Sequence, residues 1–238
     1  MGRNNIAKLV SHLMKSTLIV PTFNEIECLP KVLPLIKPEW VDEIIVVDNH
    51  SKDGTVEWCK EHGYKLITQT TRGYGNAIRE AVMQASGDII IEFPPDGSSL
   101  PEKIPVLIHK INEGYDMVIA SRYLGNAKSE DDDLLTSFGN IMFTLMTNIF
   151  FGTHYTDSLV GFRGYKKSAY KTLGLDAPHL NWVTQSSIRF PKYGFKVTEI
   201  EADEPKRIGG KRKMSPFKTG VSLLQVMWKE FWLPVNKQ

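Results

Sequence analysis

Apolar and polar positions follow a repeating order in the first half of the chain. Short apolar runs such as "STLIVPT" (Ser16–Thr22) and "EIIVV" (Glu43–Val47) end in polar turns, which predicts buried strands. Between such runs, apolar residues recur at helical spacing, as in "GYGNAIREAVMQAS" over 73–86. Strands alternating with helices from residue 16 to 121 predict βαβ units. The fold class is therefore α/β, with a Rossmann-like, mostly parallel central sheet flanked by helices.

The second half of the chain is less regular. The pattern predicts a helix over 134–151, a second near 182–193 and a strand within 194–204. A last amphipathic helix follows over 216–238. No internal repeat or low-complexity linker divides the chain, and 238 residues suit one α/β domain. We therefore expect an N-terminal tail over 1–15 and a single domain over 16–215, followed by that helix.

Composition narrows the classes of function. The formal net charge is only +2, so no overall field favours nucleic acid as a partner. Cys28 and Cys59 lack metal-ligand spacing, which indicates a reduced, cytoplasmic protein. Local charge is uneven. The segment "SEDDD" (129–133) is acidic enough to repel a phosphate, and "PKRIGGKRK" (205–213) is basic.

Any membrane contact is expected to be peripheral. The longest apolar run, Phe143–Gly152, is shorter than the roughly 20 residues of a spanning helix. Residues 216–233 form a basic, tryptophan-bearing amphipathic end with two interpretations. That end either packs on the domain or rests on a membrane surface, and the second alternative places the protein at the inner face of the membrane.

Polar side chains gather where the predicted strands end. In open parallel sheets, ligands bind at the carboxyl ends of the strands. Polar residues also fill loops without any function, and that alternative is open at this point. The residues at the strand ends are Asn24, Glu25, Asp48, Arg72, Gly73, Asp96, Ser121 and Arg122.

These side chains suit a phosphorylated ligand with a divalent ion. The chain has no GxxxxGK[ST] phosphate loop, no complete dinucleotide fingerprint and no HExxH motif. Mg²⁺ or Mn²⁺ uses one or two carboxylates with phosphate oxygens, and Asp48 and Asp96 end two different strands. Arg72 and Arg207 have the guanidinium geometry that matches a diphosphate.

Seven segments occur in the order typical of one enzyme family. The chain resembles family-2 glycosyltransferases over about residues 16–213, and is most similar to the dolichol- and polyprenyl-phosphate sugar synthases and their soluble bacterial relatives. The segments are "LIVPTFNE", "EIIVVDNHSKDGT", "RGYGNAIREAV", "GDIIIEFPPDGSSLPEKIP", "SRYLG", "TDSLVGFRGYKK" and "GFKVTEIEADEPKRIGGKRK".

The resemblance implies a GT-A fold, with a nucleotide-binding half over 16–122 and a less regular acceptor half over 123–215. It implies inverting transfer of a sugar from a UDP- or GDP-sugar. The acceptor is left open between a polyprenyl phosphate and a glycan or small molecule. A second hypothesis is a nucleotide-sugar-binding protein with impaired or no catalysis.

The resemblance also assigns roles to residues. It implies that Asp157 is the general base or positions the acceptor, that Arg163 supports the turn carrying Asp157, and that Arg207 stabilises the departing diphosphate. Asp96 is implied in catalysis through the metal. The implied nucleotide-sugar pocket consists of Pro21, Thr22, Asn24, Glu25, Asp48, Arg72, Gly73, Gly75, Asp96, Gly97, Arg122 and Lys211.

The metal motif departs from the family pattern. The DxD motif of the family maps onto Pro94-Pro95-Asp96, so the second acid is present and the first is proline. The resemblance therefore implies that Mg²⁺ or Mn²⁺ is held by Asp96 and Ser98. Glu92 is the only other nearby acid. Along a regular strand it lies about 13 Å from Asp96, which makes it a poor substitute.

Overall fold

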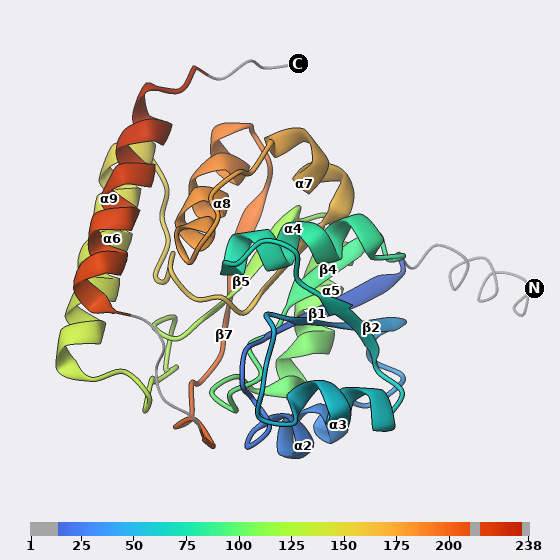
Figure 1. Ribbon diagram of the computed structural model, residues 1–238. Coiled ribbons are helices and arrows are strands. Elements are labelled where there is room, and N and C mark those ends of the chain that lie inside the picture. The colour runs from blue at the N-terminus through green and yellow to red at the C-terminus, as the bar shows by residue number, and fades with distance from the viewer. Residues whose placement is uncertain (1–13, 210–214, 235–238) are drawn as a thin grey trace, which may run out of the picture.

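The computed structural model describes residues 14–209 and 215–234 (Figure 1). Almost all of the predicted tail over 1–15 lies outside the described residues, and so does Lys211. Nothing further is said of those parts of the chain.

One sheet organises the described residues. Its strand order is β3-β2-β1-β4-β6-β5-β7, and every pairing is parallel except the two that β6 makes with β4 and β5. The predicted α/β class with a mostly parallel sheet is confirmed. The strands are β1 (Ser16–Thr22), β2 (Glu43–Asp48), β3 (Lys65–Thr68), β4 (Ile89–Glu92), β5 (Met117–Ser121), β6 (Arg163–Lys166) and β7 (Val197–Glu201).

Helices cover both faces of the sheet. In Figure 1, α4, α7 and α8 lie on one face, and α2 and α3 lie on the other. Two turns of 3₁₀ helix, η1 (Leu33–Leu35) and η2 (Pro101–Lys103), precede β2 and α5. The α-helices are α2 (Leu29–Val32), α3 (Thr55–Glu61), α4 (Tyr74–Gln84), α5 (Ile104–Asn112), α6 (Leu134–Phe151), α7 (Lys167–Leu173), α8 (Asn181–Lys192) and α9 (Pro216–Trp232).

Parallel pairing brings the predicted strand ends to one edge of the sheet. Thr22 at the end of β1 is in register with Asp48 at the end of β2, which is in register with Thr68 at the end of β3. The loops that follow these strands therefore start side by side. This arrangement is the one on which the predicted ligand site depends.

Strand β6 is the element that the sequence pattern does not predict. Its four residues, "RGYK", include a single large apolar side chain, so they show no strand periodicity. Successive side chains of β6 nevertheless suit the helices on the two faces of the sheet. Tyr165 stacks on Tyr170 of α7, whereas Gly164 lies against Ile111 of α5. The strand also places Arg163 opposite Glu92.

Helix α9 is fixed to α8 by a buried ion pair. Arg189 Nε lies 2.9 Å from both Glu230 oxygens, and its Nη2 lies 2.7 Å from Glu230 Oε1. Gln185 Nε2 donates to the same carboxylate at 2.9 Å. Leu223 and Met227 of α9 are buried on this side as well. The C-terminal helix thus packs on the rest of the chain through one face, as the first of the two interpretations expects.

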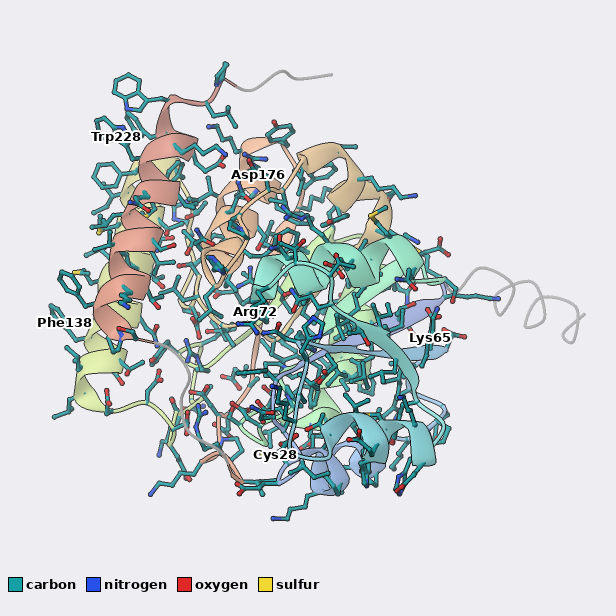
Figure 2. The ribbon with its side chains drawn as sticks, in the orientation of Figure 1. Cys28, Lys65, Arg72, Phe138, Asp176 and Trp228 are labelled. Carbon is teal, nitrogen blue, oxygen red and sulfur yellow. The ribbon has the colours of Figure 1, made fainter. Side chains whose placement is uncertain are left out.

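The opposite sides of α6 and α9 are apolar and exposed. The two helices run side by side, and Phe138 and Trp228 project from them with 65% and 68% of their surface exposed (Figures 1 and 2). Helix α6 begins at Leu134 and has 18 residues, only 22% of them buried. By length and composition it is the helix of the described chain that could cross a membrane. The apolar segment counted from the sequence, Phe143–Gly152, is therefore shorter than the apolar helix that the structure forms.

Glu230→Leu should lower the free energy of unfolding by about 3–5 kcal/mol, because it leaves the Arg189 charge buried without its partner. Urea unfolding followed by circular dichroism measures this value. The matched control is Lys229→Gln, which breaks the exposed ion pair of Lys229 with Asp176 on the same helix and should cost about 1 kcal/mol or less. Equal losses for the two variants would show that burial of the pair does not stabilise α9.

Candidate active site

A polar cavity of about 340 Å³ lies at the carboxyl edge of the sheet. It is bounded by residues from the loops after β1, β4, β5 and β7 and by the acidic segment 129–133. Ser98, Pro94 and Pro95 also line it. The charged side chains in its wall are Glu25, Asp96, Arg122, Asp131, Asp132, Glu204 and Arg207.

Asp96 occupies a tight turn after β4. Ser98 donates to Asp96 Oδ1 from its backbone nitrogen at 3.1 Å and from its hydroxyl at 2.7 Å. Gly97 has φ +84°, and a Cβ there would lie 2.4 Å from a side-chain carbon of Ile208, so only glycine fits. The turn therefore holds one oxygen of Asp96. The other oxygen, Oδ2, lies 3.5 Å from Arg207 Nη1.

Arg207 is paired with the acidic segment. Its Nε lies 3.0 Å from Asp131 Oδ1, and its Nη2 lies 2.6 Å from Asp131 Oδ2. These hydrogen bonds raise the pKa of Arg207 above its ordinary value. Asp131, from the acidic segment expected to repel a phosphate, thus pairs with Arg207, the cation expected to bind a diphosphate. Any anion that reaches Arg207 must compete with Asp131.

Arg122 is surrounded by three carboxylates. Its Nε lies 2.6 Å from Asp157 Oδ2, and its Nη1 lies 3.1 Å from Asp132 Oδ2 and 3.3 Å from Glu204 Oε2. Asp157 has no exposed surface. Burial alone would raise the pKa of Asp157, but the charge and hydrogen bonds of Arg122 hold that pKa below its ordinary value. In this structure Asp157 lies behind Arg122 and orients it.

A second cavity, of about 280 Å³, follows β1, β2 and β3, and we call it the strand-end cavity. Four residues that the resemblance assigns to the nucleotide pocket line it: Pro21, Thr22, Glu25 and Gly73. Asn49 lines it as well, and the buried Oδ1 of its side chain has no hydrogen-bond partner within residues 14–209 and 215–234. Such an atom is costly unless a ligand or water supplies a donor. The signal for Asn49 in the sequence is its position directly after Asp48.

Two predicted nucleotide contacts instead stabilise the turns beside the strand-end cavity. Asp48 is fully buried and accepts hydrogen bonds from Thr22 Oγ1 at 3.1 Å and from Ser51 N at 2.8 Å. Asn24 is exposed, with φ +54°, and its Oδ1 accepts from Lys52 N at 2.9 Å. Neither is among the residues that line the two cavities.

The glycines at the start of α4 allow close contact with protein backbone. A Cβ on Gly73 would lie 2.2 Å from Pro178 O, and one on Gly75 would lie 2.1 Å from Ala177 O. Both positions therefore require glycine, which presses α4 against the segment before α8. Gly75 is buried, whereas Arg72 is exposed at the front of the molecule (Figure 2). Neither lines the two cavities.

An apolar groove of about 280 Å³ opens directly from the polar cavity and runs between α6 and α9. Leu135 and Phe143 of α6 face Leu223 of α9 across it. Polar cavity and groove share part of their walls, so the two are continuous. The shared residues are Tyr74, Pro94, Thr136, Asn140, Leu159, Gly161 and Leu180.

The carboxylates alone do not form a metal centre. Over residues 14–209 and 215–234, no three His, Cys, Asp or Glu side chains are grouped so as to hold an ion. Asp96 offers one partly exposed carboxylate beside the Ser98 hydroxyl. That set matches a divalent ion that takes its remaining ligands from phosphate oxygens and water. The residues therefore fit a metal that binds together with a diphosphate.

Comparisons with known proteins agree with this geometry. The chain is 27% identical over 228 residues to undecaprenyl-phosphate mannosyltransferase of Micrococcus luteus, covering 90% of this chain and 93% of that protein. It is 27% identical over 214 residues to dolichyl-phosphate hexose transferase of Haloferax volcanii, covering 87% and 89% respectively.

A solved structure shows the same fold. Glucosyl-3-phosphoglycerate synthase from Mycobacterium tuberculosis, crystallised with Mn²⁺, UDP and its glucosyl product, superposes with a TM-score of 0.70. The match covers 94% of this chain and 82% of that one at 18% identity, a level that supports the fold alone. Residues 17–174 match the sequence profile of glycosyl transferase family 2. Because that match spans more than half of the chain, the protein belongs to family 2 and is a glycosyltransferase with the GT-A fold.

Proposed function

We propose that this protein is an inverting glycosyltransferase that moves a sugar from a UDP- or GDP-sugar to a polyprenyl-phosphate acceptor. The observation that carries the proposal is the continuity of the polar cavity with the apolar groove between α6 and α9. A lipid phosphate has a polar head, which Arg122 and Arg207 can attract in the cavity, and an apolar chain that matches the groove. The two relatives, named for transfer to undecaprenyl and dolichyl phosphate, support this choice over a soluble acceptor.

The donor nucleotide fits the other side of the polar cavity. The nucleoside occupies the strand-end cavity, where the unpartnered amide oxygen of Asn49 can accept a hydrogen bond from the base or ribose. The diphosphate then lies in the polar cavity, within reach of Arg207 and Arg122. Guanidinium groups stabilise the negative charge that develops on a departing diphosphate.

Mg²⁺ or Mn²⁺ is the cofactor that this arrangement suits. Asp96 and Ser98 are the residues that would hold it, together with oxygens of the diphosphate. The bound ion would neutralise charge on the leaving group. The synthase structure with the same fold contains Mn²⁺ together with UDP, which supports a divalent ion as the cofactor.

The chemistry needs no general base on this acceptor. A phosphate oxygen is already ionised, and it forms a bond to the anomeric carbon while the bond to the diphosphate breaks. The diphosphate leaves with the electron pair, and the configuration inverts. The buried pairing of Asp157 with Arg122 fits this mechanism, because it assigns Asp157 to orienting a cation near the phosphates.

We propose that the enzyme contacts a membrane through the exposed apolar side of α6 and α9. Its apolar side chains continue from the groove, and Trp228, Trp232 and Lys229 of the 216–233 segment are typical of a lipid interface. This contact puts the groove at the depth of the lipid acceptor, at the cytoplasmic face. The acceptor can then enter the groove without leaving the bilayer.

Gly220→Leu tests the groove. A Cβ on Gly220 has only ordinary contacts, the nearest at 3.6 Å from Phe143, so a leucine can fill the groove without forcing the helices apart. We expect transfer of sugar to polyprenyl phosphate in vesicles to fall at least tenfold, with the affinity for UDP or GDP unchanged. Val221→Leu, on the neighbouring residue outside the groove, is the matched control.

The same transfer assay decides between turnover and binding alone. The single acid of the Pro94-Pro95-Asp96 motif favours the alternative of a nucleotide-sugar-binding protein without catalysis. Transfer by the unaltered protein that disappears in Asp96→Ala would reject that alternative. Nucleotide-sugar binding without any transfer to lipid or soluble acceptors would instead support it, and would contradict our proposal.

Asp131→Asn should bind UDP or GDP more tightly than the unaltered protein. The substitution removes the anion that now pairs with Arg207, and a gain of about threefold corresponds to the modest energy of a partly exposed ion pair. Isothermal titration in Mg²⁺ at low ionic strength measures it. Asp133→Asn, which alters the N-cap of α6 without touching Arg207, is the control. A weaker affinity in Asp131→Asn would mean that Asp131 helps to bind the nucleotide.

A further inference from the structure

Glu92 is a buried carboxylate that the proposed chemistry does not use. It lies at the end of β4 with no exposed surface. Its oxygens accept hydrogen bonds from Tyr74 Oη at 2.8 Å, Tyr165 Oη at 2.9 Å and Trp182 Nε1 at 3.0 Å. Three donors on one buried acceptor fix each other's positions, because any movement leaves a polar group without a partner.

Of the three donors, Tyr74 is the one that reaches the ligand site. It is the first residue of α4, and it lines the polar cavity, the apolar groove and the strand-end cavity. Among the described residues that line these spaces, Leu180 is the only other one that lines all three. Tyr165 and Trp182 are completely buried and line none of them. The hydroxyl of Tyr74 thus points into the core while its ring borders all three spaces.

The surroundings of Tyr74 leave the ring little freedom. A Cβ on Gly161 would lie 3.2 Å from Tyr74 Oη, so the backbone of Gly161 lies close to the hydroxyl. The close contacts of Gly73 and Gly75 with Pro178 and Ala177 hold the start of α4 in place. Burial, with the neighbouring Glu92 charge, raises the pKa of Tyr74 well above its ordinary value, so the hydroxyl stays protonated and donates.

We propose that Tyr74 contacts the transferred sugar and orients it between donor and acceptor, and that Glu92 is the positioning residue that holds the Tyr74 ring. The inference rests on the proposed function. With the nucleoside in the strand-end cavity, the diphosphate in the polar cavity and the lipid in the groove, the sugar lies where the three spaces meet. An aromatic ring there can cover the apolar C–H face of a hexose.

Donor affinities separate this role from a structural one. Titrations in Mg²⁺ compare UDP with UDP-glucose and GDP with GDP-mannose. In Tyr74→Leu, the sugar nucleotide that binds the unaltered protein should bind about fivefold more weakly, while the matching nucleotide alone changes less than twofold. Tyr165→Phe removes a different donor from the same carboxylate and should change neither affinity.

Tyr74→Phe gives the second readout. It keeps the ring but releases it from Glu92, so kcat for transfer should fall about fivefold with KM for the donor within twofold. If Tyr74→Leu does not fold, the more conservative Tyr74→Phe still tests the inference. Equal losses of kcat in Tyr74→Phe and Tyr165→Phe would overturn this inference but not the proposed function. The same holds if Tyr74→Leu weakens the affinities for nucleotide and sugar nucleotide by the same factor. Failure of the unaltered protein to bind any of the four ligands would overturn the proposed function with it.

Discussion

Arg163 is a full positive charge in the middle of the molecule with no exposed surface. Its guanidinium donates to Val160 O at 3.1 Å, to Val183 O at 3.1 Å and to Ser186 Oγ at 2.8 Å. Because an unpaired buried charge costs several kcal/mol, the turn before β6 and the start of α8 must keep the positions that supply these acceptors. The prediction that Arg163 supports the turn carrying Asp157 is confirmed by these contacts.

The rest of the site follows from that turn. The backbone nitrogens of Leu159 and Val160 donate to Asp157 Oδ1 at 3.2 Å, and Asp157 in turn orients Arg122 toward the polar cavity. Arg189 of α8 and Glu230 of α9 fix these two helices to each other, and α9 forms one wall of the groove. Two buried arginines, Arg163 and Arg189, therefore hold the elements that form the walls of the polar cavity and the apolar groove.

Part of the lining of the two cavities could be predicted from the chain. Parallel strands end at one edge, so a residue at or just after the end of a strand, such as Thr22 or Asp96, is placed at that edge by local pattern alone. The pairing of Arg207 with Asp131 could not be predicted, because it joins loops 76 residues apart. Strand β6 was missed because antiparallel insertion between β4 and β5 depends on tertiary packing around Tyr165 and Gly164. The helix over 134–151 was predicted, but the exposure of its outer side was not, because the sequence shows which residues are apolar and not which of them the rest of the fold covers.

A crystal structure with Mg²⁺ and either UDP or GDP tests the account most directly. We predict the nucleoside in the strand-end cavity beside Asn49, the diphosphate against Arg207 with Asp131 displaced, and Mg²⁺ within about 2.1 Å of an Asp96 oxygen. The groove between α6 and α9 should remain empty of nucleotide. A diphosphate bound away from Asp96 and Arg207, or a nucleotide bound with no metal at Asp96, would contradict the account.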